Sequence, residues 1–534
     1  MKSAGYRHVI ILTLLVASVF GNTLGHGFVW DDTLFVPDGE VYRSFDISAI
    51  FLTLKANGLE YLPIRDLSYA FDCNLWKDNP AGYHLSNLLY FWLTILVLYF
   101  FAVRLVELSS QKDSPVNRDD VHNIAFVSAA LFAVHPIHSE AVSFITCRNV
   151  LLSGLFFFIS CYAWLEYLTG RGKQRVMMYA AALFFFLLSI FSKATGIILP
   201  LILLVETWII SRSFARRQMT VLAPFFILSA GAFLLFTEIA RKTDVFLRDQ
   251  YSTAVSDKII LAVQIPSFYL VKLVLPFDFS ADYGTEQFNT TLATPGGICS
   301  LLLLIMLTLT IWLCRNKAAL VSFAISWFLI SLIPVLHLFP TIPVVADRYV
   351  YLPSFGFCFV FAVTGTRFLG RRFLFGAAPL LMLLAILTCR QNLVWKNEKI
   401  LWENTLAVSP RSATALAELG RIYFWEERNV PIAMEMYRRS SEVNAGDPAF
   451  DIFQGHLLMM KKDFPNAIIA FRRAVDKDPE NIEAVINLGR AYQSTGAVEN
   501  AAEQYRRAIS LPELDPRKNM RGRAADYLEY LNRR

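Results

Sequence analysis

Two adjacent carboxylates, Asp31 and Asp32, directly follow the first long apolar stretch of this chain. The stretch covers residues 9–25, and the chain continues as "GHGFVWDDTLF". A carboxylate near hydrocarbon costs free energy unless it is solvated or paired, so acids in such places are often functional. At the head-group level this pair could act as general base on an acceptor hydroxyl. A solvated loop start explains the pair equally well.

Four cations that are expected near the same membrane face are candidates for binding a phosphate group: Arg65, Arg148, Lys193 and Arg348. Arginine suits phosphate because it offers a planar fork of donors and stays charged. For Arg65, a salt bridge to Asp66 or Glu60 is an equally good explanation. For Lys193, a simple placement of the ammonium among lipid head groups is the alternative.

Polar residues in the same regions are candidates for positioning a substrate: His84, Asn87, His135, His138, Glu140, Asp282, Asp347 and Tyr351. His84 and Asn87 are three residues apart and share one helical face. The cluster of His135, His138 and Glu140 raises the question of a zinc site. The intervening proline and the lack of HExxH spacing favour polar pairing instead. We therefore expect no metal and no other cofactor, with a divalent metal as the alternative.

The composition predicts a polytopic helical membrane protein. The 534 residues are 55% hydrophobic and 18% charged, and the mean hydropathy is +0.44. Apolar windows of about 16–22 residues recur, which is the length that an α-helix needs to cross hydrocarbon. Eleven spans are expected, near residues 9–25, 84–106, 123–134, 150–167, 177–191, 195–210, 220–237, 297–313, 318–336, 352–367 and 373–388.

Basic loops such as "GRGKQR" and "SRSFARR" predict the cytoplasmic side. The amino terminus is then inside, the carboxyl terminus is outside, and the first span is an uncleaved anchor. The outer loops are residues 27–83, 238–295 and 337–351, so every candidate residue lies toward the outer face. The apolar run 259–277 is interpreted as a helix on that face, because a crossing there would invert the following basic loop. The seven cysteines are scattered without a CxxC, which favours buried thiols.

The last part of the chain has a repeat of about 34 residues. Gly420, Gly455 and Gly489 recur at this spacing, as do Ala433, Ala467 and Ala501, and also Tyr437, Phe471 and Tyr505. This period is typical of tetratricopeptide repeats, in which small residues let paired helices approach and aromatic residues fill the gap. We therefore expect a membrane domain over 1–400, a linker over 401–411 and a helical solenoid over 412–534. Its charge is nearly balanced, so nucleic acid is not an expected partner.

Together these motifs resemble the TMTC family, the transmembrane and tetratricopeptide repeat-containing protein O-mannosyltransferases, including bacterial-type members. The resemblance is carried by "FVWDD", "YLPIRDLS", "GYHLSN", "HPIHSEAV", the "SK" at 192–193, "DRYVYLPSFGF" and the repeats. It implies a GT-C fold, a polyprenyl-phosphate or pyrophosphate sugar donor and an inverting transfer to a hydroxyl on protein or envelope glycan. It also implies that the first acid, Asp31, is the base and that Asp32 is its neighbour. Ala194 and Cys147 depart from the glutamate and glycine usual in the family.

Alternative functions remain open at this stage. One is a non-catalytic scaffold whose repeats bind a protein or peptide for envelope assembly, and another is an O-antigen ligase-like enzyme. A transporter is disfavoured because charged or broken helices are scarce at mid-membrane. The expected location is a bacterial inner membrane with periplasmic repeats, or the endoplasmic reticulum with luminal repeats in a eukaryote.

Overall fold

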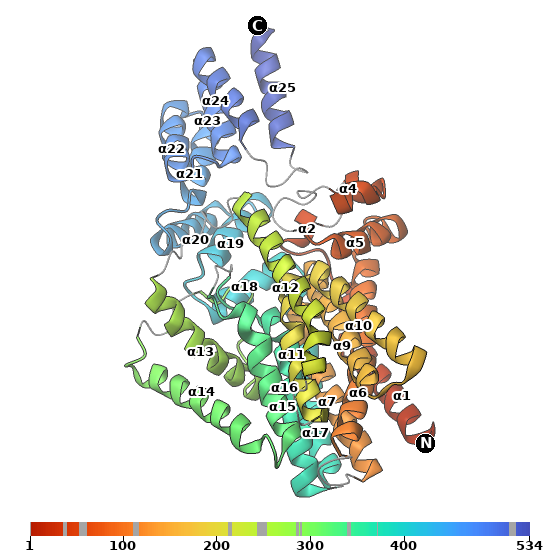
Figure 1. Ribbon diagram of the computed structural model, residues 1–534. Helices are drawn as coiled ribbons and strands as arrows, with labels where there is room; N and C mark the ends of the chain where they lie inside the picture. Colours follow the sequence, from red (N-terminus) through yellow and green to blue (C-terminus); the bar gives the residue numbers. More distant parts are fainter. Residues whose placement is uncertain are drawn as a thin grey trace. The chain divides into compact units, whose positions relative to one another are not determined.

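The computed structural model describes residues 2–35, 40–52, 61–110, 117–211, 216–242, 254–284, 288, 291–338, 343–370, 372–511 and 519–533. Every regular element in these ranges is a helix, as the sequence predicted (Figure 1). Contacts within the chain divide it into two compact units. We call them the membrane unit (residues 1–281 and 285–398) and the repeat unit (residues 282–284 and 399–534).

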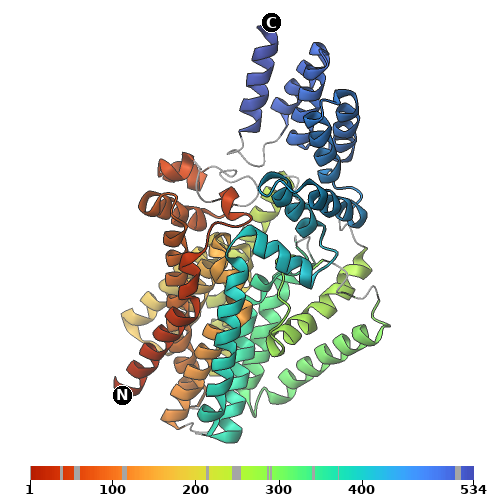
Figure 2. The same ribbon diagram turned by 180° about the vertical axis from the view of Figure 1, so that it is seen from behind.

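The membrane unit is a bundle of long apolar helices (Figures 1 and 2). Among the described residues, nine helices are long and apolar enough to cross a membrane, or ten if one bent pair is counted. A further helix, α15, is apolar but shorter. The expected spans fall on α1 (Lys2–Phe20), α6 (Pro80–Ser110), α7 (Arg118–Val134), α9 (Arg148–Thr169), α10 (Gly172–Ser192), α11 (Leu199–Ser211), α12 (Arg216–Lys242), α14 (Pro295–Cys314), α15 (Ala319–Leu332), α16 (Tyr351–Leu369) and α17 (Arg372–Asn392). The chain is therefore a multi-pass membrane protein.

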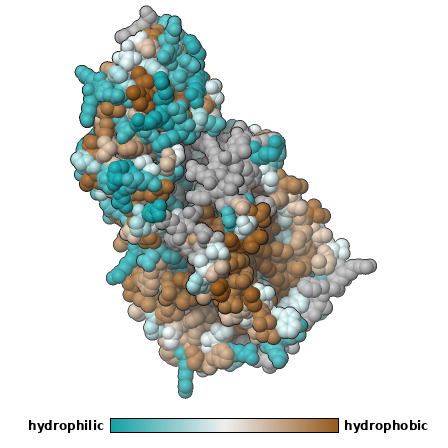
Figure 3. All heavy atoms as spheres, turned by 90° about the vertical axis from the view of Figure 1, so that its left-hand side faces the viewer, coloured by the Kyte–Doolittle hydropathy of each residue, from teal (hydrophilic) through white to brown (hydrophobic). Residues whose placement is uncertain are grey.

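The surface of this unit is that of a membrane protein. Figure 3 shows hydrophobic side chains over a broad part of one face. Along α14, Leu302, Ile305 and Leu309 are each more than half exposed. Apolar areas of this size are rare on proteins surrounded by water and are expected where lipid covers a helix bundle.

The bent pair brings a short buried segment into the bundle. Helix α7 ends at Val134, and η2 (Pro136–His138) and α8 (Ser139–Ser143) continue at an angle of 54°. Pro136 causes the break, because proline has no N–H to donate and disfavours helical backbone in the residue before it. A second short turn, η3 (Ile145–Cys147), then leads into α9. The break positions residues 135–147 among the ends of several spans.

Two other parts of the membrane unit are not spans by length and composition. Short α-helices follow α1 and precede α6 in the sequence: α2 (Asp32–Phe35), α3 (Glu40–Arg43), α4 (Ile47–Leu52) and α5 (Pro63–Trp76). Helix α13 (Val255–Val274) contains Pro266 and is absent from the candidate spans of the described residues. Its Tyr269 side chain bonds to the backbone of Ala346, with the hydroxyl 2.9 Å from the carbonyl oxygen and 3.2 Å from the nitrogen.

The repeat unit consists of helix pairs. They are α19 (Ala413–Trp425) with α20 (Val430–Val443), α21 (Ala449–Met460) with α22 (Phe464–Lys477), and α23 (Ile482–Ser494) with α24 (Val498–Ser510), followed by α25 (Met520–Asn532). A methyl group on Gly420 would lie 2.9 Å from the Tyr437 ring, and one on Gly489 would lie 2.7 Å from the Tyr505 ring. The periodic glycines therefore permit the close approach that their spacing predicted.

Residues 401–411, which the sequence analysis took as a linker, mostly form α18 (Glu398–Val408). Leu401 and Trp402 on this helix are fully buried. Their burial shows that this segment is a packed part of the structure.

Candidate active site

The acidic pair lies in a strap that we define as residues 26–32. Asp31 is half-buried, whereas Asp32 is fully buried. The Asp32 carboxylate accepts hydrogen bonds from the backbone N–H of Thr146 at 2.7 Å, from the Thr146 hydroxyl at 2.8 Å and from the backbone N–H of Val29 at 3.2 Å. Both of its oxygens are engaged within the protein. Asp32 is thus an anchor, and Asp31 is the more exposed member of the pair.

The protonation of Asp32 is unusual. Burial raises the pKa of Asp32 to about 7, although its hydrogen bonds with Thr146 and Val29 favour the charged form. The charge of Asp31 adds to the rise. In the same strap, burial and the neighbouring Lys396 lower the pKa of His26 to about 4. The strap therefore carries a neutral imidazole and one carboxyl group that changes charge near neutral pH.

Aromatic stacking fixes the strap against two other segments. Trp30 stacks on Phe144 with 5.4 Å between ring centroids, and Phe144 stacks on Trp395 at 5.1 Å. Trp30 has a positive φ of 49°, which is costly for a non-glycine residue and persists only where the surroundings enforce it. The backbone N–H of Gly27 also donates to the Lys396 carbonyl at 3.1 Å. These contacts hold the backbone before Asp31, and the hydrogen bonds of Asp32 hold it directly after Asp31.

A small hollow in the membrane unit contains two of the predicted cations. Its lining residues are Val150, Ser153, Lys193, Thr195, Ser331, Val335, Arg348, Tyr349, Tyr351 and Leu352. The Lys193 ammonium lies 5.8 Å from the centroid of the Tyr349 ring, and the Arg348 guanidinium lies 5.3 Å from it. Two cations with several hydroxyl groups form a suitable environment for an anionic oxygen.

Arg348 is held in place by Glu140. Its guanidinium forms an ion pair with the Glu140 carboxylate, and its backbone N–H donates to the same carboxylate at 2.6 Å. Glu140 is 2% exposed, and the Arg348 side chain is 14% exposed. Glu140 thereby fixes the arginine and balances part of its charge.

The acidic strap and the hollow share one neighbourhood. The Cys147 thiol interacts electrostatically with Glu140, Arg348, Lys193 and Asp32. Tyr69 on α5 interacts in the same way with Arg148, Arg65, Asp32 and Asp66. Asp32 therefore shares these electrostatic neighbours with residues from four other parts of the sequence: residues 65–69, residues 140–148, Lys193 and Arg348.

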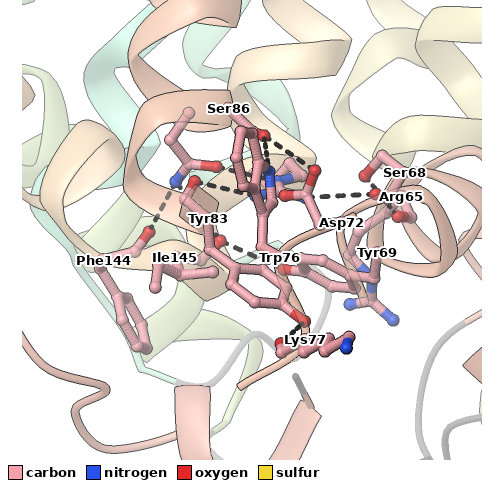
Figure 4. A network of polar contacts seen from close by, with 12 residues as sticks. Arg65, Ser68, Tyr69, Asp72, Trp76, Lys77, Tyr83, Ser86, Phe144 and Ile145 are labelled. Carbon is pink, nitrogen blue, oxygen red and sulfur yellow. Dashed lines mark hydrogen bonds and ion pairs between the residues drawn. The ribbon is translucent and has the colours of Figure 1, made fainter. Parts of the chain in front are cut away.

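Arg148 belongs to a buried polar network. Figure 4 labels several members of this network, among them Tyr69, Asp72 and Tyr83. Arg148 is fully buried, with its guanidinium 2.6 Å from Asp72, 2.8 Å from the Asn87 side-chain oxygen and 3.0 Å from the Tyr83 carbonyl. The Tyr69 ring covers it at 4.8 Å. The donors of Arg148 are used inside the fold, which favours a structural role over the predicted binding of phosphate.

Arg65 also has a partner inside the fold. It is 2% exposed and forms an ion pair with Asp66 at 2.9 Å. The structure thus favours the salt-bridge alternative for Arg65. Its guanidinium lies within 6.0 Å of the Tyr69 ring, beside the Arg148 network.

The polar residues at the start of α6 support the backbone rather than open a site. His84 is fully buried, with Nε2 3.4 Å from the Gly27 carbonyl oxygen. The Asn87 side-chain nitrogen faces the carbonyl oxygens of Val142, Phe144 and Ile145 at 3.4–3.5 Å. His84 ties α6 to the strap, and Asn87 ties α6 to residues 142–145. These contacts favour a supporting role for both side chains over the predicted direct contact with substrate.

The predicted histidine cluster is divided among separate partners. His135 lies 3.0 Å from the Leu273 carbonyl, and His138 lies 3.3 Å from the Ser354 hydroxyl and stacks on Phe132. Among the described residues, no group of three His, Cys, Asp or Glu side chains is arranged to hold a metal. That the protein works without a metal stays a prediction.

The last predicted residues fall in different places. Asp347 is buried at the start of η6 (Asp347–Val350), directly before Arg348, and Tyr351 lines the hollow. Asp282 belongs to the repeat unit, where it accepts a hydrogen bond of 2.6 Å from Ser412. Asp282 is therefore assigned to the packing of the repeat unit.

Comparison with known proteins finds relatives of this chain. Protein O-mannosyl-transferase TMTC3 from Mus musculus is 24% identical over 98% of this chain and 57% of its own length. Protein O-mannosyl-transferase F38B6.6 from Caenorhabditis elegans is 26% identical over 79% of this chain and 60% of its own length. The chain is related to the TMTC proteins. It spans less than two thirds of the length of these TMTC relatives.

The repeats are identified independently. The family described as tetratricopeptide repeat matches residues 423–482 and 454–517. The matched residues include the end of α19 and all of α20–α24, so the carboxyl-terminal helices are tetratricopeptide repeats.

Sequence reasoning did not find Thr146, Phe144 or Trp395. Thr146 is the main partner of Asp32, and the two aromatic residues brace the strap. A threonine within an apolar segment carries no distinctive pattern, so only the fold shows its role. Tyr349 was not among the predicted site residues, and its ring lies 5.8 Å from the Lys193 ammonium and 5.3 Å from the Arg348 guanidinium.

The raised pKa of Asp32 predicts a pH-dependent stability. Between its ordinary value of 3.8 and about 7, the folded protein keeps a proton that the unfolded chain releases. The contribution of Asp32 to stability is therefore complete below about pH 4 and falls as the pH rises to about 7. We expect the melting temperature of Asp32→Asn to rise relative to that of the wild type across this range. A difference that does not change with pH would contradict the assignment.

Proposed function

We propose that the protein is a membrane glycosyltransferase that moves a sugar from a polyprenyl-phosphate donor to a hydroxyl group on a protein. The observation that carries the proposal is the half-buried Asp31, fixed by Asp32 in the neighbourhood of the hollow that contains Lys193 and Arg348. The names of the TMTC relatives support protein O-mannosyl transfer as the reaction to test first.

In the proposed reaction, Asp31 accepts a proton, and Lys193 and Arg348 stabilise the leaving phosphate. The acceptor hydroxyl gives its proton to the Asp31 carboxylate as its oxygen attacks the anomeric carbon of the sugar. The bond from that carbon to the phosphate oxygen breaks, and the polyprenyl phosphate leaves with the electron pair. Lys193 and Arg348 stabilise the developing negative charge. A single displacement of this kind inverts the configuration of the sugar.

The membrane topology belongs to the same proposal. The basic loops favour an outer position for the site and for the repeats, so the acceptor is a polypeptide on the exoplasmic side. Tetratricopeptide repeats commonly bind peptides, and we assign to them the capture of this acceptor. This arrangement lets a lipid-linked donor and a water-soluble acceptor meet at the membrane surface.

Replacing Lys193 tests the donor site. We expect Lys193→Gln to weaken binding of a polyprenyl-phosphate sugar by about 10- to 150-fold, because a charge-assisted hydrogen bond contributes about 1.5–3 kcal/mol. The control is Lys173→Gln, which removes an exposed lysine near the start of α10, the helix that Lys193 directly follows. Binding is measured with the full chain in nanodiscs. Equal donor affinity in both variants would remove Lys193 from the site.

A further inference from the structure

Helix α5 has its apolar and polar faces reversed relative to a helix in water. Ile64, Leu67, Phe71 and Leu75 recur every three or four residues and form one stripe. Ile64 and Leu67 are half-buried, Phe71 is 59% exposed and Leu75 is 67% exposed. We call these four residues the α5 stripe.

The opposite face of α5 carries the charged residues of the helix and is packed inside the membrane unit. Arg65, Asp66 and Asp72 on this face are each less than 5% exposed. Asp72 pairs with Arg148, and the Tyr69 hydroxyl donates to the Ile145 carbonyl at 3.1 Å. The large apolar side chains of α5 point outward, and each of them would cost free energy if its surroundings were water.

Neighbouring elements continue the apolar surface. On α6, the next helix along the chain, Leu85 is 44% and Leu89 is 48% exposed. On α4, Ile47 is 53% and Leu52 is 78% exposed. Because α6 is a membrane span, the exposed side of its first turns faces lipid. The stripe thus belongs to a helix that packs against a candidate span with exposed apolar side chains of its own.

The orientation of α5 agrees with a position at the membrane surface. Both ribbon views show α5 lying across the direction of the long spans instead of along it (Figures 1 and 2). The chain after its last turn, Lys77–Asp78–Asn79, is exposed and polar. An apolar face with a polar end, placed across the spans, is the arrangement of an interfacial helix.

We propose that α5 is an interfacial helix whose stripe contacts the acyl chains of the lipid leaflet nearest the candidate active site. The occupant of this surface is the bilayer itself. Lipid then contacts the outer face of α5, while Asp72 and Tyr69 on its inner face contact Arg148 and Ile145. The lipid leaflet thereby supports the polar network behind Asp31, independently of the identity of the reaction.

Photo-crosslinking in nanodiscs tests the proposal. Phe71→p-benzoylphenylalanine and Leu75→p-benzoylphenylalanine place a photoreactive group on the stripe, and Met460→p-benzoylphenylalanine places one on the repeat unit as control. Met460 is 66% exposed, similar to Leu75. After irradiation of the purified full chain, mass spectrometry is expected to find phospholipid adducts at positions 71 and 75 and none at 460.

Two results would overturn the proposal. One is the absence of lipid adducts at both stripe positions in variants that melt like the wild type. The other is a crosslink to a second copy of the chain, which would make the stripe a protein interface. As a second measurement, the double variant Phe71→Ser/Leu75→Ser is expected to lose most of the increase in melting temperature that the wild type shows on transfer from detergent to nanodiscs. An unchanged increase would contradict the supporting role of lipid.

Discussion

Asp31→Asn is expected to lower the rate of sugar transfer by about 10²–10⁴-fold, the usual contribution of a positioned general base. The amide keeps the shape of the carboxylate but does not accept the proton of the acceptor hydroxyl. Donor affinity and melting temperature are expected to stay near those of the wild type, because Asp31 is only half-buried and Asp32 provides the anchoring contacts. The measurement is turnover with lipid-linked sugar and purified protein.

The matched control is Asp32→Asn, which changes the neighbouring carboxylate. Its expected effect includes a change in stability, because Asp32 accepts hydrogen bonds from Thr146 and Val29. Undiminished turnover in Asp31→Asn, with the loss of activity confined to Asp32→Asn, would assign the base to the second acid of the pair.

Arg148→Met is expected to destabilise the membrane unit by about 3–5 kcal/mol, because it leaves the buried Asp72 carboxylate without its cation. The measurement is the apparent free energy of unfolding in a fixed detergent. Donor affinity per folded molecule is expected to change little. Lost stability with unchanged donor affinity would support a structural role for Arg148 and not the phosphate-binding role that the sequence suggested.

The double variant Arg148→Met/Asp72→Leu provides the internal control. Removing both charges also removes the uncompensated carboxylate, so part of the lost stability is expected to return. If Arg148→Met instead melts like the wild type and loses donor binding, Arg148 is a phosphate ligand and the structural interpretation is wrong.

The fold was predictable because its signals are periodic and repeated. Apolar windows of membrane-spanning length predicted a polytopic helical bundle, and Gly420 and Gly489 with their aromatic partners predicted the repeats. The salt bridge of Arg65 was foreseen as an alternative because Asp66 is its neighbour in the chain. Local spacing is sufficient for such contacts.

The division of roles among the charged residues was not predictable. Residue type and membrane side gave Arg148 and Arg348 the same expected role. The structure separates them by burial, because Arg148 is fully enclosed and Arg348 lines a hollow. The burial of Asp32 depends on Thr146, which is 114 residues away in the sequence. Contacts at such separations leave no local pattern.

The most direct test of the account is transfer by the purified full chain. The protein in nanodiscs is supplied with polyprenyl-phosphate mannose and candidate acceptor polypeptides, and the products are analysed by peptide mass spectrometry. We predict that a hexose is added to serine or threonine hydroxyls of the acceptor and that Asp31→Asn adds none. If a correctly folded protein binds acceptors through its repeats but transfers no sugar from any polyprenyl-phosphate donor, the chain is a scaffold and the proposed function is contradicted.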